Sequence, residues 1–416
     1  MAANNRIFYA CQQVGLTADG AAKETQPVVI HGAQSVGITT NFNLSQVFEL
    51  GQISIYENIE DIPDVEVTMT KVLDGSIPMY LLATGGATAP TLSGRQNQKS
   101  TFTLGIWPDT NDAATEGENP RAQVECSGMF VSSIGYNFPL EDNFTEDITL
   151  VGNHKVWVGD SRVVADGATA QISNVGSKAG GTEGGENFTG VFPVAGEDPS
   201  GLASRGGVNR RENLLFGLGD GEMGSGLTDS NGYHRNPDLC CFPKEIHGIT
   251  SSGTNEKGAD GNFGAHISNI TVSADLGREQ ILELGRKAPY HRFATFPVEV
   301  TCEIEITAIS GDMISATEEG ILSGHTTQTS YASTCNTDSG NLSNATIRIA
   351  TCEGTRIFLG KKNKLSSVNY AGGDAGGGNA TVTYSFTTFN DLTVIHEQTI
   401  GRYENEIDFW ENRHTH

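Results

Sequence analysis

Apolar and polar residues alternate along several stretches of the chain, and two of these stretches are alike. Val65, Val67 and Met69 alternate with glutamate and threonine residues. In the run 298–307, every second residue is apolar and all the others are glutamate or threonine. A period of two predicts β-strands that bury one face and expose the other to water. The exposed side of the second strand is acidic.

These strands belong to longer blocks that occur twice. The block "QVFELG" that begins at Gln46 returns as "QILELG", which begins at Gln280. With the same spacing between copies, "VSSIGYNF" at 131–138 is matched by "LSSVNYAG" at 365–372. The run Val-Glu-Val-Thr at 65–68 also recurs. The period is far longer than a solenoid unit of about 20–50 residues. We therefore interpret the chain as two copies of one domain.

The repeat predicts how the chain is organised. A short helix is expected at 74–86, where Asp74 or Ser76 can cap it, and a weaker equivalent at 310–320. The connector between the copies is rich in glycine and has few secondary-structure signals. The predicted segments are an N-terminal arm at 1–27, module 1 at 28–157, a connector or insertion at 158–262, module 2 at 263–390 and a C-terminal tail at 391–416.

Each copy carries a loop between its repeated strands, and the two loops have opposite charge. The first loop spans 52–64 and the second 286–297. Drift on a solvent-exposed loop would explain the difference. The alternative is that acidic loops of one subunit meet basic surface of a neighbour. The charged residues concerned are Glu57, Glu60, Asp61 and Asp64 in the first loop, and Arg286, Lys287 and Arg292 in the second.

The composition agrees with an all-β protein and argues against one kind of partner, a nucleic acid held by its phosphates. The 416 residues suffice for two or three domains, and 51 glycines with many short alternating runs favour strands joined by turns. With 50 acidic and 26 basic residues, the net charge of −24 argues against a site that clamps nucleic acid phosphates. The seven cysteines are odd in number and scattered, which favours free thiols, and Cys302 lies on the apolar face of its strand.

Targeting and membrane signals are not evident. The sequence contains no apolar stretch of about 18–20 residues, and "MAANNRIFYACQQVG" lacks the layout of a signal peptide. We expect the chain to fold in a cytoplasm.

Residues for catalysis, cofactors or metals do not form a convincing constellation in the sequence. The segment 217–226, "GLGDGEMGSG", lacks the Lys-Ser/Thr ending of a phosphate-binding loop. The acidic segment 109–118 lacks the spacing of a calcium loop. His414 and His416 have no third ligand nearby. The sequence therefore predicts a protein that is not an enzyme and binds no cofactor.

The order of motifs resembles a known family. "FELGQ" leads through a long loop to "IPDVEVTMTKVLDG", then to "IPMYLLATG" and "SSIGYNFPLEDNFTEDITLVGN". This arrangement resembles bacteriophage tail tube proteins, also called major tail proteins. The second copy, from "ISNITVSADLG" to "EIEITAISGD", is similar to the same module. The resemblance covers the two predicted modules and leaves the arm, the connector and the tail outside it.

The resemblance implies a fold and an assembly. Tail tube modules are β-sandwiches with one flanking helix, and their inner sheets join into a continuous β-barrel around a DNA channel. Rings of subunits stack into a tube, and the long loop after the second strand packs onto the next ring. That role would fall to the two charged loops described above. A duplicated chain would close a six-membered ring as a trimer with pseudo-sixfold symmetry, with a hexameric ring as the second choice.

An acidic channel would let double-stranded DNA slide without specific binding. The same polar strand faces could instead form the outer surface. The candidate lumen residues are Glu66, Glu299, Glu303, Glu305, Thr381 and Thr383. The resemblance further implies tail-terminator, baseplate and tape-measure proteins as partners, a sheath where the tail is contractile, and a place in the virion after assembly in the host cytoplasm.

Two alternatives to a tail tube remain open. A baseplate, tail-terminator or head-decorating protein with a related β module would form a single ring or cap. A carbohydrate-active β protein would use acidic residues such as Glu303 and Glu305 as a catalytic pair, although only 3 tryptophans are available as sugar platforms.

Overall fold

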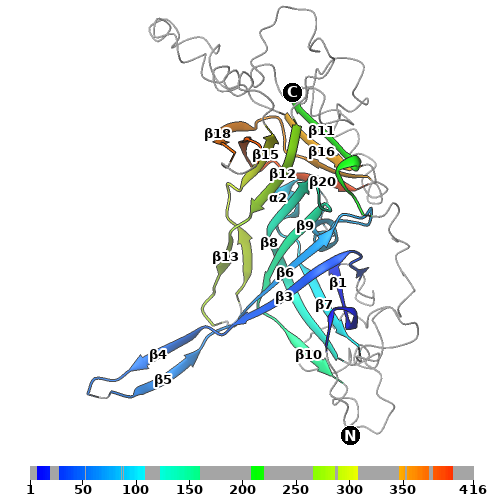
Figure 1. The fold of residues 1–416 in the computed structure, drawn as a ribbon. Coiled ribbons are helices and arrows are strands. Elements are labelled where there is room, and N and C mark those ends of the chain that lie inside the picture. Colours follow the sequence, from blue (N-terminus) through cyan, green and yellow to red (C-terminus); the bar gives the residue numbers. More distant parts are fainter. Residues whose placement is uncertain are drawn as a thin grey trace, which may run out of the picture. The chain divides into compact units, whose positions relative to one another are not determined.

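The computed structural model describes twelve parts of the chain, and every structural statement below refers to these. They are residues 7–18, 28–51, 53–85, 87, 89–107, 122–159, 208–219, 266–285, 289–307, 346–351, 354–373 and 378–396. Within them the secondary structure is mostly strand (Figure 1), with two short α-helices, α1 (Met79–Ala83) and α2 (Leu92–Arg95). The expected all-β fold with little helix is confirmed.

The chain divides into two compact units, each assembled from separate stretches. Unit 1 combines 1–134, 146–205 and 276–296. Unit 2 combines 135–145, 206–275 and 297–416. The stretch 276–296 is notable because its sequence belongs to the second repeat, yet it lies in the unit that contains the first. The predicted module boundaries themselves stay predictions.

Unit 1 is built on antiparallel strands whose alternating apolar residues are buried. Val67 and Met69 of the predicted strand are 0% and 2% exposed, whereas Glu66 and Thr68, which alternate with them, are exposed. The sheet path runs through β3 (Ala33–Asn41), β6 (Asp64–Val72), β9 (Thr145–Gly152), β8 (Ala122–Pro139), β7 (Ser100–Ile106), β1 (Gln12–Ala18) and β2 (Val28–Val29), with β10 (Val156–Gly159) on β8.

Helix α1 begins later than predicted, because its cap comes from a distant strand. The helix starts after Pro78, and the carboxylate of Glu146 accepts hydrogen bonds from the amides of Met79 (2.5 Å) and Tyr80 (3.0 Å). A carboxylate at this position satisfies amides that have no partner within the helix. Asp74, expected as a possible cap, instead forms an ion pair with the buried Lys71 (3.4 Å). The weaker helix expected at 310–320 lies outside the described residues.

Unit 2 has two antiparallel four-stranded arrangements. Cys302 and Ile304 are 1% and 0% exposed, which confirms that Cys302 is a buried free thiol on the apolar face. The first arrangement has the order β12 (His266–Asp275), β15 (Glu299–Thr307), β19 (Thr381–Phe389), β18 (Lys364–Ala371). The second has the order β11 (Leu214–Gly219), β16 (Thr346–Thr351), β17 (Thr355–Phe358), β20 (Thr393–His396).

The predicted connector contributes to the second of these sheets. Strand β11 lies within 158–262, a segment in which the sequence showed few structure signals, and it pairs with β16 from Leu214↔Thr351 to Gly219↔Thr346. Its short run, "LLFGLG", contains two glycines and offers no clear alternation. Pairing with β16 therefore accompanies the strand, and the assignment of 158–262 as a connector or insertion stays a prediction.

Each of the two loops predicted from the repeat contains the second strand of a hairpin. The first is β4 (Leu44–Phe48) with β5 (Ile55–Glu60), and the second is β13 (Arg278–Ile281) with β14 (His291–Ala294). In Figure 1, β4–β5 extends away from the rest of unit 1. We call β4–β5 the arm and β13–β14 the second hairpin.

The strands that lie in the two predicted copies have the same order and share one local irregularity. The path β3-β6-β9-β8 has the same order as β12-β15-β19-β18. The β3–β6 ladder has a bulge between Ala33 and Ser35, and the β12–β15 ladder has one between Ile267 and Asn269. The two bulges are separated by the same spacing as the repeated sequence blocks. A bulge is a specific local feature, so its repetition extends the sequence match to the backbone.

Candidate assembly surfaces

The arm exposes apolar side chains along both of its strands. Leu50 and Ile53 at its tip are fully accessible, at 103% and 104%. A contiguous group of large apolar side chains on a protein surface is typical of an interaction surface. The acidic residues Glu57, Glu60 and Asp61 are also exposed here. The full apolar set is Leu44, Val47, Phe48, Leu50, Ile53, Ile55, Tyr56 and Ile59.

Asn43 fixes the base of the arm. Its carbonyl accepts the amide of Asp61 at 2.8 Å, which closes the chain where the arm begins and ends. Its side-chain amide donates to the carbonyl of Ile62 (3.0 Å) and to Oδ2 of Asp64 (3.0 Å). The arm therefore leaves unit 1 from a point whose backbone is held by side-chain hydrogen bonds.

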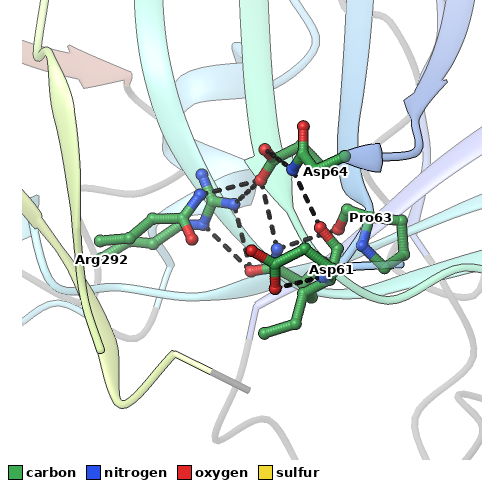
Figure 2. A network of polar contacts seen from close by, with 8 residues as sticks. Asp61, Pro63, Asp64 and Arg292 are labelled. Carbon is green, nitrogen blue, oxygen red and sulfur yellow. Dashed lines mark hydrogen bonds and ion pairs between the residues drawn. The ribbon is translucent and has the colours of Figure 1, made fainter. Parts of the chain in front are cut away.

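Asp64 is the centre of a polar network at this base, shown in Figure 2. Its Oδ1 accepts hydrogen bonds from Gln280 (2.8 Å) and Asn153 (3.2 Å), and it forms an ion pair with Arg292. Partial burial alone would raise the pKa of Asp64, but the hydrogen bonds from Asn43, Arg292 and Gln280, together with the charge of Arg292, hold that pKa below its ordinary value. The carboxylate therefore joins the arm to both strands of the second hairpin.

Arg278 holds the second hairpin against the rest of unit 1. Its guanidinium donates to the carbonyls of Val131 (2.7 Å) and Gln96 (2.7 Å) and lies 5.3 Å from the ring of Phe130. Burial lowers the pKa of Arg278 to about 10, so it remains charged at neutral pH. His291 packs edge-on against Phe130, with ring centroids 5.0 Å apart. Burial, together with the nearby Lys99 and Arg278, lowers the pKa of His291.

The charged loop residues thus have different environments. Asp64 and Arg292, which the sequence assigned to loops of different copies, form an ion pair within one chain. Glu57, Glu60 and Asp61 remain exposed. Arg286 and Lys287 lie outside the described residues. An inter-ring role for these seven residues stays a prediction, and the intrachain ion pair gives two of them a structural role that the sequence did not reveal.

The candidate lumen residues of unit 2 share one face of its sheet. Glu305 lies opposite Thr383, and Thr381 lies opposite Thr307, next along the same face. Glu303 and the exposed Glu299 occupy the same side of β15. The opposite side is buried. The structure therefore brings these residues together on one polar face, and its facing a channel stays a prediction.

Glu66 occupies the equivalent polar side of β6 in unit 1. It is exposed and lies opposite Thr39 of β3.

In the described part of the chain, no cluster of histidine, cysteine or acidic residues has the arrangement of a metal site. No helix in the described residues is long and apolar enough to cross a membrane.

Comparisons with known proteins found similarity among solved structures only. No family model matches the chain, and no curated protein matches it. A tube-terminating cap of the anti-feeding prophage matches with 15% identity and a TM-score of 0.28, over 38% of this chain and 95% of the cap chain. The sheath-tube complex of the PVC extracellular contractile injection system matches with 13% identity and a TM-score of 0.26, over 38% and 94%.

The crystal structure of an Hcp protein is a further match, with 10% identity and a TM-score of 0.21, over 36% of this chain and 98% of that one. The structures with similarity thus include the cap and the baseplate of the anti-feeding prophage, the sheath-tube complex of an extracellular contractile injection system, and an Hcp protein. The likeness is too low to carry a functional conclusion. Function has to be argued from the residues and surfaces of this chain.

Proposed function

We propose that this chain is a structural subunit that forms rings and stacks them into the tube of a phage-type tail, a hollow conduit for genome ejection. The observation that carries the proposal is the repeated four-stranded path, β3-β6-β9-β8 and β12-β15-β19-β18, with matching bulges. A chain that builds the same sheet twice supplies two equivalent segments of a larger closed sheet. The internal duplication inferred from the sequence is part of this proposal.

The polar sheet faces supply a channel lining. Glu303 and Glu305 alternate with buried Cys302 and Ile304, so one sheet separates an acidic surface from an apolar core. Phosphates are repelled by such a surface and find no cationic clamp on it. In the proposed tube, this face and the Thr381–Thr383 side of β19 line the lumen, and DNA passes without specific contacts.

The arm supplies a contact between rings. Its apolar residues have no partner surface within the described chain, and burying Leu50 and Ile53 against a neighbour would contribute about 25 cal/mol per Å² of apolar area. The second hairpin is fixed to the rest of unit 1 through Arg278 and Arg292. The arm is thus the part of each chain that is available to reach another ring.

Electron microscopy of the purified protein tests the proposal. We expect hollow tubes of stacked rings with a trimeric, pseudo-sixfold repeat. Isolated rings that never stack under any salt or concentration would instead support a terminator, baseplate or decoration role. Globular monomers under all conditions would refute both. A count of copies per virion separates the first two outcomes, because a tube needs many copies and a terminator few.

A further inference from the structure

Lys71 lies on the face of β6 that is buried in the core of unit 1. It continues the buried series of Val67 and Met69 at a period of two, at a position where the strand pattern favours an apolar residue. Lys71 is 0% exposed. An ammonium group in such a place is costly unless it is paired and hydrogen-bonded, so the lysine needs a specific partner.

Asp74 is that partner. Its Oδ1 lies 3.4 Å from Nζ of Lys71, and the side chains of Lys71 and Asp74 are only 1% and 9% exposed. Ser76 donates to the same Oδ1 from its backbone amide (3.2 Å) and from its hydroxyl (2.5 Å). The lysine Nζ donates to the carbonyl of Ile77 at 3.1 Å and to the Ser76 hydroxyl. An amine and a carboxyl group are therefore in contact at a site shielded from water.

The buried site favours the neutral form of the lysine. Desolvation lowers the pKa of Lys71, although the nearby carboxylates of Asp74 and Glu146 act in the opposite direction. The neutral amine, whose share rises as this pKa falls, is the nucleophilic form of a lysine. Glu146 is 0% exposed, so a second buried carboxylate acts on the same amine.

We propose that Lys71 and Asp74 condense to an isopeptide bond, a covalent modification that the folded chain makes by itself. Nζ attacks Cγ of Asp74, the bond from Cγ to Oδ2 breaks, and two protons of the ammonium group leave with Oδ2 as water. One cation and one anion become a neutral amide, so the charges balance and no oxidant or further reactant is needed. Glu146 is the buried base that relays the first proton. The inference is independent of ring or tube formation.

The surroundings suit the amide better than they suit the ion pair. Condensation removes both charges from a buried site, where each charge carries a desolvation cost. The amide keeps one N–H and one carbonyl oxygen, and both already have partners. The N–H has an acceptor in the carbonyl of Ile77, and Oδ1 has a donor in the amide of Ser76. The same amide stabilises the negative charge that develops on Oδ1 during the attack, as a donor in an oxyanion hole does.

A second reaction at the same aspartate would release the same mass. Gly75 follows Asp74, and an aspartate before a glycine can close onto the next backbone nitrogen to form a succinimide, also with loss of water. The succinimide does not require Lys71. Hydroxylamine cleaves a succinimide and leaves an ordinary amide intact, so the two products can be separated by experiment.

Intact-mass spectrometry of the full chain tests the proposal. We expect the wild-type protein to have about 18 Da less than its sequence mass, because the modification releases one water. The matched control is K71R, which keeps the positive charge beside Asp74 but has no amine that can condense. It should have its full sequence mass while circular dichroism shows that it is folded. Treatment with hydroxylamine should leave the loss in the wild-type protein unchanged.

Peptide mapping of the wild-type protein locates the bond without a variant. Trypsin does not cleave after a lysine whose amine is acylated, so one peptide should contain both Lys71 and Asp74 and carry the mass loss. Fragmentation of this peptide should give no backbone ions from the bonds between residues 71 and 74, because the side-chain bond closes a ring around them. The same ions should appear for K71R.

The possible outcomes decide the inference. A loss of water that K71R lacks, that hydroxylamine does not remove and that maps to residues 71–74 supports it. Wild-type protein at its full sequence mass overturns it. A loss that K71R shares, or that hydroxylamine removes, also overturns it, because that result identifies the succinimide. All of these measurements use the single chain, so their failure would leave the proposed tube untouched.

The role of Glu146 has its own measurement. We expect E146Q, if folded by circular dichroism, to acquire the mass loss more slowly after synthesis than the wild-type protein, because glutamine cannot accept the proton. Equal rates in the two proteins would overturn the relay.

Discussion

Arg292 and Asp64 lie 228 residues apart in the sequence and form an ion pair at the base of the arm. Arg292 belongs to the second repeat and Asp64 to the first, yet both are in unit 1. The Asn153 side-chain oxygen also accepts from Nη2 of Arg292 at 3.1 Å, so the guanidinium keeps a neutral partner as well as its counterion. The contact joins the two repeats within a single chain.

Loss of this counterion should destabilise unit 1. Arg292 is 6% exposed, so Asp64→Ala leaves a buried guanidinium without a counterion. We expect the free energy of unfolding to fall by about 1–2 kcal/mol, because the Asp64 carboxylate is partly exposed and its contribution is screened by solvent. Denaturant unfolding followed by circular dichroism measures this. Glu57→Ala, on the exposed arm, is the control and should change stability little.

The same pair predicts a dependence of stability on acid. The pKa of Asp64 is lower in the folded chain than its ordinary value of about 4. Its contribution is therefore fully present above that ordinary value and is lost as the pH falls through the lower, folded value. We expect the stability difference between wild type and Asp64→Asn to shrink in this acid range. A difference that stayed constant from neutral pH down to about pH 2 would contradict the assignment.

The apolar tip of the arm should control assembly and not folding. Leu50 and Ile53 are fully accessible, so L50S/I53S should change the free energy of unfolding by no more than about 0.5 kcal/mol. Tube formation should fall sharply, as measured by sedimentation and electron microscopy. Ile7→Ser removes an exposed apolar side chain away from the arm and should leave tubes intact. If L50S/I53S formed normal tubes, this would contradict a role of the arm in the contact between rings.

The charge on the arm provides an independent test of stacking. Replacing Glu60 and Asp61 with lysine reverses the charge of two exposed residues, and so should weaken ring stacking before it affects folding. The matched control is E141K/D142K, an exposed acidic pair in the turn between β8 and β9. We expect shorter tubes for E60K/D61K at an unchanged melting temperature. Equal tube lengths for the two variants would argue against a charged contact at the arm.

Several features of the fold could be predicted because they depend on local patterns. The strands around Val67 and Ile304 alternate with a period of two, and burial of one face follows directly from that period. Cys302 was placed correctly for the same reason. The repeated sequence blocks predicted which strands correspond, because similar sequences favour similar strands.

Other features could not be predicted, because their cause lies elsewhere in the chain. The hairpin strands β5 and β14 were expected to be loops, since β5 is exposed on both faces and β14 spans only four residues. Helix α1 starts where Glu146 can accept its amides, and β11 forms because β16 lies beside it. These contacts are between residues distant in the sequence, so no local pattern records them.

The sequence by itself determined the repeat, the alternating strands and the acidic character of one sheet face. Only the tertiary structure decided which charged residues meet. The repeated sequence blocks place Asp64 and Arg292 in the loops of different copies, and folding pairs them in one chain while Glu57, Glu60 and Asp61 stay exposed. The charges of the side chains indicate which groups attract one another. The distance between these groups depends on how the chain folds, and electrostatic attraction falls with distance.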